Sequence, residues 1–271
     1  MRMKIAEKYN RRVQQINSLL CVGLDADLKK IPDRFLSQDN PLFAFNKWII
    51  DQTHIYTAAY KPNLAFYESE GIAGWKSLQL TVEYLQKNYP EIVTIADAKR
   101  GDIGNTNFGY VKSIFVDLGF DAVTLHPYLG QESLAPFLER ADKASIILCK
   151  TSNPGGGELQ DLLVEDEDGS REPMWLKVAK QVSQEWNQAE NCMLVVGATY
   201  PKELAKVRQV VGEMTILVPG IGAQGGDLKS VLKAGLNTNG QGLIINVGRD
   251  IIFDENPGER AKWYSKQIRT P

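Results

Sequence analysis

The sequence predicts an α/β fold, a single (β/α)₈ TIM barrel over residues 1–271 with an N-terminal helix and one long loop at residues 154–173. Eight short apolar runs alternate with amphipathic stretches along the 271 residues, and a barrel of eight such units typically needs ~250 residues. The runs are almost continuously apolar, which is typical of parallel strands buried on both faces. The first run lacks the G-x-G-x-x-G turn of dinucleotide-binding open sheets, so the barrel is favoured over a doubly wound sheet.

The eight expected strands begin at Ser18, Thr57, Glu91, Asp121, Ala144, Cys192, Thr215 and Gly242. Helices are expected between them, because strand–helix alternation is typical of parallel βαβ units. Asn40 and Pro41 are a typical N-cap and first helical residue, and Pro173 opens another helix with Trp175 and Trp186 on its apolar stripe.

The segment at residues 154–173 is too long for an ordinary strand-to-helix connection. Its glycines at 155–157 are suited to hinge a lid, and a disordered loop is an equal alternative at this stage. Its acidic run, residues 165–168, is expected to be solvated surface.

The composition excludes several classes of protein. Lys and Arg number 31 against 33 Asp and Glu, a net charge of −2, so the basic excess of a nucleic-acid-binding protein is missing. No apolar run approaches the ~20 residues that cross a bilayer, and the N-terminus reads as an amphipathic helix rather than a secretory signal. Three cysteines in apolar runs indicate reduced thiols. We therefore expect a cytoplasmic protein without a nucleic-acid or membrane partner.

Charged residues stand at the ends of three expected strands, where buried strands usually carry apolar or uncharged residues. Asp97 and Lys99 are two apart, so on a strand both point to one face, whereas Asp102 lies beyond the strand in the loop. Lys61 ends the neighbouring strand, and Asp25 ends the first with a carboxylate suited to ribose-like hydroxyls. A structural ion pair is the alternative. Desolvating such an array costs several kcal/mol per ion, however, so electrostatic catalysis at the barrel mouth explains it better.

Glycines follow the seventh expected strand, and Gly248 and Arg249 end the eighth. The glycines that surround Gln224 are Gly220, Gly222, Gly225 and Gly226. In barrels the loops after these two strands commonly bind phosphate through backbone N–H groups, and a guanidinium adds a fork of donors. Turn glycines and a surface arginine would explain either segment alone. Together they favour a phosphorylated small molecule as the ligand.

Other residues that could take part in catalysis or metal binding are weaker candidates. His126 is expected to be structural, and Ser152 lacks a nucleophile elbow and a partner histidine, so it is expected to form hydrogen bonds only. No H-x-E-x-H or C-x-x-C spacing predicts a metal site.

Four segments resemble the orotidine 5′-phosphate decarboxylase family. They are Lys61, D-A-K-R-G-D at residues 97–102, P-G-I-G-A-Q-G-G-D at residues 219–227 and V-G-R at residues 247–249. The similarity extends from Gly23 to Arg249, and the D-A-K-R-G-D-I-G-N-T and K-T-S-N-P-G segments resemble the bacterial type 2 branch. The D-x-K-x-x-D core belongs to a wider suprafamily, but its combination with Lys61, G-A-Q-G-G and V-G-R is specific to the decarboxylase.

The resemblance implies a homodimeric enzyme that converts orotidine 5′-monophosphate to uridine 5′-monophosphate and CO₂, the last step of de novo pyrimidine synthesis, without a metal or organic cofactor. Its catalytic array would comprise Lys61, Asp97, Lys99 and Asp102, with Lys99 protonating a C6 carbanion. Asp102 would enter the site of the neighbouring subunit, and Thr106 would also reach across to it.

The resemblance also implies roles in substrate binding. Asp25 and Lys61 would hold the ribose hydroxyls, and Ser152 would contact the pyrimidine edge. Gln224 would bridge base and phosphate. Arg249 and nearby backbone N–H groups, including the region of Gly248, would grip the phosphate.

Two other functions stay open at this point. A hexulose-phosphate synthase shares D-x-K-x-x-D, but such an enzyme generally needs a Glu on the preceding strand to hold magnesium, where this chain carries Lys61. A non-catalytic nucleotide sensor would use the same phosphate pocket but would have no need of the charge array.

Overall fold

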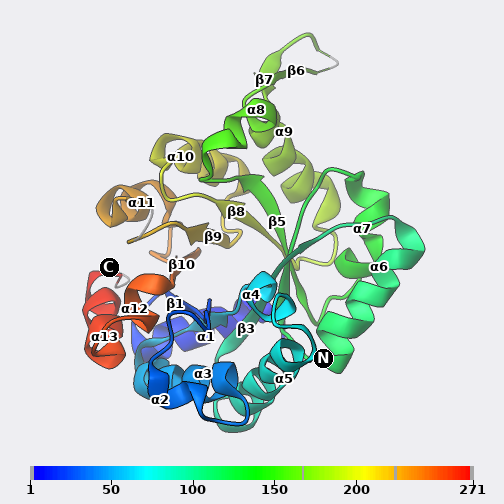
Figure 1. Ribbon diagram of the computed structural model, residues 1–271. Coiled ribbons are helices and arrows are strands. Elements are labelled where there is room, and N and C mark those ends of the chain that lie inside the picture. Colours follow the sequence, from blue (N-terminus) through cyan, green and yellow to red (C-terminus); the bar gives the residue numbers. More distant parts are fainter. Residues whose placement is uncertain (1–2, 167, 223–224, 269–271) are drawn as a thin grey trace.

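The computed structural model describes residues 3–166, 168–222 and 225–268, and these form a closed barrel of eight parallel strands (Figure 1). The order around the barrel is β1-β10-β9-β8-β5-β4-β3-β2, so the first and last strands pair and close it. The strands are β1 Leu20–Gly23, β2 Ala59–Lys61, β3 Val93–Arg100, β4 Ala122–Leu125, β5 Ala144–Lys150, β8 Cys192–Val196, β9 Ile216–Pro219 and β10 Leu243–Val247. Each overlaps one of the eight apolar runs, which confirms the predicted barrel.

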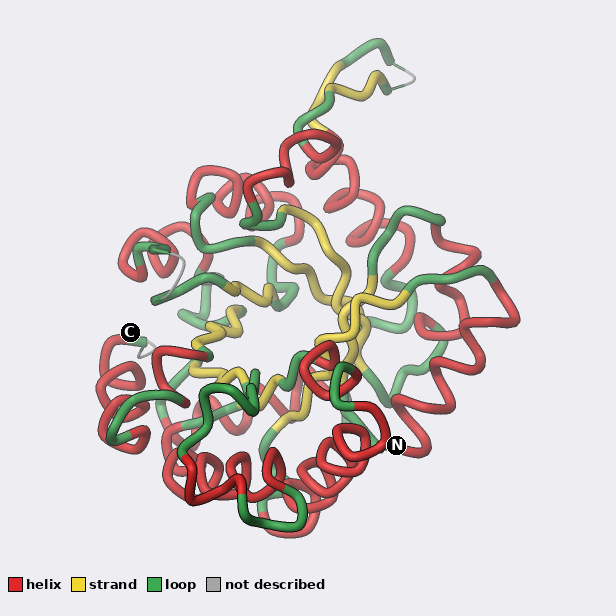
Figure 2. The backbone as a smooth tube through the Cα atoms, viewed as in Figure 1, coloured by secondary structure: helices red, strands yellow, loops and turns green. Residues whose placement is uncertain are grey.

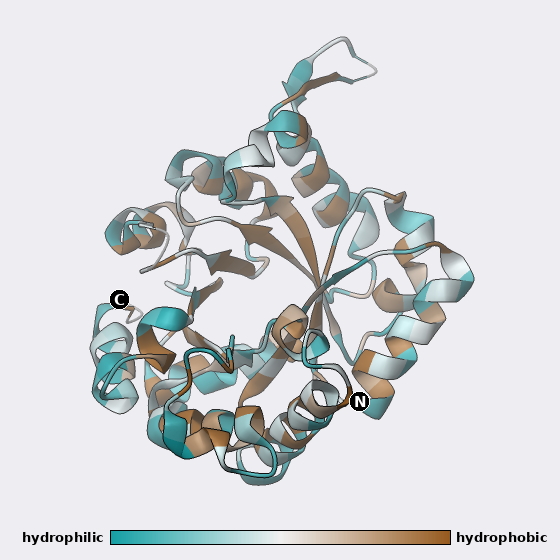
Figure 3. Cartoon of the chain, in the orientation of Figure 1, coloured by the Kyte–Doolittle hydropathy of each residue, from teal (hydrophilic) through white to brown (hydrophobic). Residues whose placement is uncertain are grey.

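The strands form an apolar cylinder inside a layer of helices, whose outward faces are more polar (Figure 3). Every residue of β1, β4, β8 and β10 is buried, as expected for strands covered on both faces. β3 departs from this pattern near its carboxyl end, where Asp97 is partly buried and Lys99 is exposed. The charged residues of this strand therefore lie at one end of the barrel.

Helices occupy the connections between the strands (Figure 2). The longer ones are α1 Ile5–Ile16, α3 Pro41–Thr53, α5 Gly71–Asn88, α6 Gly104–Val111, α7 Gly130–Leu138, α9 Met174–Gln181, α10 Pro201–Val211, α11 Leu228–Gly235 and α13 Pro257–Gln267. Short helices and turns are α2 Asp33–Leu36, η1 His54–Tyr56, α4 Leu64–Glu68, η3 Pro154–Gly156, α8 Gly157–Gln160 and α12 Arg249–Ile252. Two π-helical segments, η2 Lys112–Asp117 and η4 Val182–Trp186, continue α6 and α9.

Helix starts follow proline as the sequence predicts. Pro41 is the first residue of α3, and Pro173 directly precedes α9. Asn40 is the N-cap residue of α3, as predicted, although its side chain makes no capping hydrogen bond, whereas Asn256 accepts one from the backbone N–H of Glu259. The fixed φ of proline preorganises the first turn of α3 without that bond.

The predicted N-terminal helix, α1, covers the amino ends of the strands. The Tyr9 hydroxyl lies 3.0 Å from the carbonyl oxygen of Leu19 and 2.8 Å from that of Leu243, at the starts of β1 and β10. The Arg12 guanidinium donates to the carbonyl oxygen of Thr57, just before β2 (3.2 Å). These buried donors satisfy carbonyl groups at the strand starts, so α1 closes the end of the barrel opposite the charged residues.

Residues 154–173 form an excursion between β5 and α9 with secondary structure of its own. After η3 and α8, the strands β6 Leu163–Glu165 and β7 Arg171–Pro173 pair antiparallel in a hairpin that projects away from the barrel (Figure 1). The segment is therefore not a disordered loop, because the paired strands satisfy the hydrogen-bonding groups of the backbone. It is also not a lid over the barrel mouth, because the hairpin points outward.

The acidic run of the excursion lies at the surface, as expected, since Glu165 and Asp168 are exposed, and part of it forms ion pairs. Glu165 forms an ion pair with Arg171 (2.8 Å), and Asp166 forms one with Lys177. Glu167 lies outside the described residues. Opposite charges therefore connect the hairpin to itself and to α9.

No helix in the described part of the chain is long and apolar enough to span a bilayer. Cys21, Cys149 and Cys192 are buried and form no disulfide. Burial raises the pKa of each of these thiols to about 12. The three thiols are therefore protonated near neutral pH and are poor nucleophiles.

Tyr9→Phe should lower the free energy of unfolding by about 1–2 kcal/mol, because it removes the hydroxyl that serves two buried carbonyl groups and keeps the ring. Urea denaturation followed by circular dichroism measures the change. Tyr128→Phe is the matched control, since that side chain is 79% exposed and its substitution should change the free energy by less than about 0.5 kcal/mol. Equal stabilities of the two variants would contradict the role given to Tyr9.

Candidate active site

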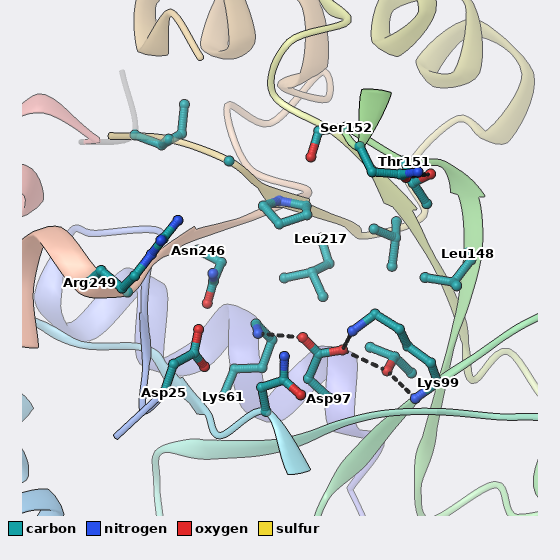
Figure 4. Close-up of a pocket in the computed structure, with 18 of the residues that line it drawn as sticks. Asp25, Lys61, Asp97, Lys99, Leu148, Thr151, Ser152, Leu217, Asn246 and Arg249 are labelled. Carbon is teal, nitrogen blue, oxygen red and sulfur yellow. Dashed lines mark hydrogen bonds and ion pairs between the residues drawn. The ribbon is translucent and has the colours of Figure 1, made fainter. Parts of the chain in front are cut away.

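Three charged side chains meet at the carboxyl end of the barrel. One oxygen of Asp97, on β3, lies 2.7 Å from Nζ of Lys61 at the end of β2, and the other lies 2.6 Å from Nζ of Lys99 (Figure 4). The Lys61 side chain is 4% exposed, whereas that of Lys99 is 49% exposed. The structure thus places a carboxylate between a buried ammonium group and an accessible one.

The backbone that carries Lys99 is not a regular strand. The register between β3 and β4 shifts between Ala96 and Arg100, and Lys99 has a φ of 48°, in the left-handed region. The simple alternation expected from the spacing of Asp97 and Lys99 is therefore wrong in detail, because an irregularity re-aims the second side chain. A non-glycine residue in this conformation costs of order 1–3 kcal/mol and persists where the surroundings hold it.

Thr124 on β4 holds that irregular backbone. Its hydroxyl accepts a hydrogen bond from the backbone N–H of Lys99 (3.0 Å) and donates one to the Asp97 carboxylate (3.0 Å). One side chain therefore supports both charged residues. The sequence reasoning missed it, although a threonine in an otherwise apolar run, A-V-T-L, was an available signal.

The electrostatics keep Lys61 and Asp97 ionised. Burial by itself lowers the pKa of Lys61, but the carboxylates of Asp97 and Asp25 outweigh it and raise that pKa above its ordinary value. Burial likewise disfavours the charged form of Asp97, but the ammonium groups of Lys61 and Lys99 outweigh it and hold its pKa well below the usual range. At neutral pH the site therefore holds a fixed pattern of alternating charge.

Asp25 lies beside this array at the end of β1. One of its carboxylate oxygens is buried and accepts no hydrogen bond from any residue that the structure describes. A buried carboxylate oxygen without a donor is an unfilled acceptor, and such a group is costly unless a ligand supplies the donor. Asp25 also lines the cavity (Figure 4), so its carboxylate stands where a hydroxyl-bearing ligand could bind.

The first and last strands approach closely beside Asp25. A side chain at Gly23 would come within 3.1 Å of the Cα of Gly248, a tight contact, so glycine allows the close approach of the two strand ends. Gly248 leads directly into α12, which begins with Arg249. The arginine thus reaches the cavity from the last strand, on the side opposite Lys99 (Figure 4).

The cavity has a volume of about 480 Å³, within the usual range for small-molecule sites. Leu148, Val195 and Leu217 contribute apolar lining, and Pro219 and Gly220, at the end of β9, also line the cavity. Thr151 and Ser152, which follow β5, line the wall across the cavity from Lys61 and Asp97 (Figure 4), and Asn153 also lines the cavity. Gln224 lies outside the described residues.

Polar residues that the sequence reasoning missed also line the cavity: Asn63, Asn153, Gln160 and Asn246. Asn246 carried a signal, since it is a polar residue inside the apolar run L-I-I-N-V. Gln160 carried none, because it comes from the excursion and only folding brings it to the cavity.

Two predicted site residues do not line this cavity in the single chain. The Asp102 carboxylate accepts a hydrogen bond from the backbone N–H of Ile103 (2.7 Å), and its own N–H donates to Asn107 (3.0 Å). Thr106 lines a separate depression between α5 and α6 with Trp75. Asp102 lies in the connection from β3 to α6, and Thr106 lies in the first turn of α6.

His126 is structural, as expected. A side chain at Gly101, which has a φ of 152°, would come within 2.8 Å of the His126 ring. The backbone N–H of His126 donates to the carbonyl oxygen of Arg100 (2.9 Å). The histidine thus packs against the turn that follows β3.

The described residues contain no group of three or more His, Cys, Asp or Glu side chains arranged to hold a metal ion.

Comparison with known proteins identifies the relatives of this arrangement. The sequence profile described as "Orotidine 5'-phosphate decarboxylase / HUMPS family" matches residues 18–264, which include all eight barrel strands. The chain belongs to this family. It is 49% identical over 257 residues to the orotidine 5′-phosphate decarboxylase of Christiangramia forsetii, covering 95% of this chain and 92% of that protein.

Other members of the orotidine 5′-phosphate decarboxylase / HUMPS family are similarly close. The orotidine 5′-phosphate decarboxylase of Bacteroides fragilis is 48% identical, with 95% of this chain and 93% of that protein covered. Leishmania donovani OMP decarboxylase is similar in structure, with a TM-score of 0.87, 40% identity and 98% of both chains covered. Against Leishmania donovani UMP synthase the TM-score is 0.88 at 41% identity, and the match covers 98% of this chain but only 56% of that longer one.

Asp97→Asn should cost about 3 kcal/mol of unfolding free energy at pH 7, because it leaves the buried Lys61 ammonium without its counter-charge. The pKa of Asp97 is lower in the folded than in the unfolded protein. The carboxylate therefore stabilises the fold above its unfolded pKa of about 3.9, and this contribution is lost as the pH falls towards the folded pKa.

Urea denaturation at pH 7 and pH 3 tests this. The difference in unfolding free energy between wild type and Asp97→Asn should be smaller at pH 3 than at pH 7. Asp117→Asn, which removes an exposed ion pair with Lys112, is the matched control and should cost less than about 1 kcal/mol at both. A pH-independent cost for Asp97→Asn would contradict the assignment of charge at this position.

Proposed function

We propose that this protein decarboxylates orotidine 5′-monophosphate to uridine 5′-monophosphate and CO₂, with Lys61, Asp97, Lys99 and Asp102 as its catalytic residues. Membership of the orotidine 5′-phosphate decarboxylase / HUMPS family supports the reaction. The observation that carries the mechanism is the Asp97 carboxylate held between two ammonium groups in a cavity whose far side carries Arg249.

The cavity is suited to the three parts of such a nucleotide. Arg249 and the backbone around Gly248 face one end and would bind the phosphate, since a guanidinium and backbone N–H groups favour that anion. Asp25, with its unfilled carboxylate oxygen, and Lys61 would hold the ribose hydroxyls. Ser152 would contact the pyrimidine edge on the wall that faces Asp97. Gln224 would bridge base and phosphate.

The reaction requires a cation beside C6 of the base. The bond from C6 to the carboxylate carbon breaks, CO₂ leaves, and the electron pair stays on C6. Lys99 would stabilise this charge and transfer a proton from Nζ to C6, and the neutral amine would then regain a proton from solvent. The exposure of the two lysines, which both line the cavity, distinguishes their proposed roles: the Lys99 side chain is 49% exposed, whereas that of Lys61 is 4% exposed.

The preorganised charge acts more strongly here than it would in water, because the protein positions it before the reaction. At an effective dielectric of 20, two unit charges 4 Å apart interact by about 4 kcal/mol. A single contact of that size supplies only part of the barrier reduction expected of an enzyme. Binding energy from the remote phosphate, delivered through Arg249, would supply more of it.

Asp102 would complete the site of a second subunit. In the single chain it lies outside the cavity, in an exposed connection that also carries Ile103, an apolar side chain that is 63% exposed. We propose a homodimer in which Asp102 and Thr106 of each chain enter the partner's site. A cytoplasmic location and the absence of nucleic-acid partners remain predictions from composition.

Lys99→Ala should reduce turnover of orotidine 5′-monophosphate by at least about 10³-fold, because it removes both the cation beside C6 and the proton donor. The decrease in substrate absorbance measures the rate. Circular dichroism should show an intact fold, since this side chain is half exposed. Near-normal turnover by the variant would refute the proposed chemistry.

A mixture of two inactive variants tests the shared site. Lys99→Ala and Asp102→Ala homodimers should each be inactive, whereas a heterodimer would contain one site with both native residues. Equal mixing after reversible dissociation should restore about one quarter of the wild-type activity, since half of the dimers are mixed and one of their two sites is intact. If the mixture stays inactive while exchange of subunits is confirmed by mass, Asp102 does not act across the dimer.

A further inference from the structure

The start of the excursion is bound to the end of β5 by a buried lysine. Nζ of Lys150 lies 2.5 Å from a carboxylate oxygen of Asp161, at the end of α8, and 4.7 Å from the centre of the Tyr200 ring. The Lys150 side chain is 1% exposed and that of Asp161 is 54% exposed. A buried ammonium group needs a counter-charge and a polarisable neighbour. Lys150 therefore holds Asp161, and with it α8, against the barrel.

A second contact joins α8 to the residue after β5. The Gln160 side chain accepts a hydrogen bond from the backbone N–H of Thr151 (3.0 Å) and donates one to its hydroxyl (2.8 Å). The Thr151 hydroxyl donates in turn to the side chain of Asn153 (2.6 Å). The Gln160 amide therefore binds both the backbone and the side chain of Thr151. These two hydrogen bonds fix the position and the orientation of that residue.

The segment from Thr151 to Asn153 also packs closely against two glycines. A side chain at Gly156 would come within 3.0 Å of the carbonyl oxygen of Thr151, and one at Gly197 would come within 2.8 Å of Ser152. The backbone N–H of Gly156 donates to the carbonyl oxygen of Asn153 (3.0 Å). Ser152 is therefore held between β8 and the base of the excursion, in the wall of the cavity.

We propose that α8 is a clamp that positions the segment from Thr151 to Asn153 for recognition of the pyrimidine, with Gln160 and Asp161 as positioning residues. Lys150 anchors the clamp from the barrel. The inference rests on the proposed function, because it assumes that Ser152 contacts the base. It gives the excursion a function that does not require its hairpin to cover the cavity.

The test separates recognition of the base from recognition of the phosphate. Calorimetry would measure the binding of uridine 5′-monophosphate and of ribose 5-phosphate to the full-length protein. In Gln160→Ala, loss of two hydrogen bonds should weaken the binding of uridine 5′-monophosphate about tenfold. The affinity for ribose 5-phosphate should stay within about twofold of the wild-type value. Asp161→Asn should act in the same direction and raise KM for orotidine 5′-monophosphate more than it lowers kcat.

Thermal denaturation should show that both variants still fold, although Asp161→Asn should lower the melting temperature because it leaves the buried Lys150 ammonium without its counter-charge. Gln160→Glu keeps the acceptor for the Thr151 N–H and should recover part of the affinity for uridine 5′-monophosphate. Glu165→Gln, which removes an ion pair in the hairpin, is the matched control and should change the affinity for neither ligand. Equal weakening of both ligands, or no weakening in Gln160→Ala, would overturn the clamp. Failure of the wild type to bind uridine 5′-monophosphate or to consume orotidine 5′-monophosphate would instead overturn the function on which the clamp depends.

Discussion

The ion pairs of the Asp97 carboxylate with Lys61 and Lys99 are the interaction on which the site depends. Lys61 is buried and stays charged because the carboxylate is present, and Asp97 stays ionised because two ammonium groups flank it. Thr124 holds the irregular backbone that brings Lys99 to the same carboxylate. Such an arrangement costs desolvation energy and backbone strain. A rigid barrel, with the strands on both sides paired, can bear that cost.

The closure of the barrel decides which charges meet. β2 and β3 carry the three charged residues that meet at Asp97, and β4 carries the threonine that supports them. Pairing of β1 with β10 brings Asp25 beside Gly248 and Arg249. Cationic and anionic groups therefore alternate around one cavity. Lys99, the proposed proton donor, and Arg249, the proposed phosphate ligand, stand on opposite sides of it (Figure 4), so in the proposed function binding and chemistry are separated in space but act on one ligand.

The excursion after β5 has two parts with different surroundings. Its hairpin extends outward and is held by exposed ion pairs, which contribute little to stability. Its base is fixed by the buried Lys150 and by the two hydrogen bonds of Gln160. The part that contacts the barrel is therefore the part suited to shape the cavity, whereas the hairpin can vary without disturbing the site.

The sequence by itself determined the barrel and most of the charged residues of the site, because buried parallel strands are almost wholly apolar and any charge at their ends stands out. Lys61, Asp97, Lys99, Asp25 and Arg249 were found in this way. Only the tertiary structure showed that Thr124 supports the array, that Gln160 reaches the cavity and that residues 154–173 form a hairpin. These features depend on contacts between distant segments and on a local irregularity of β3, and neither leaves a periodic pattern in the chain.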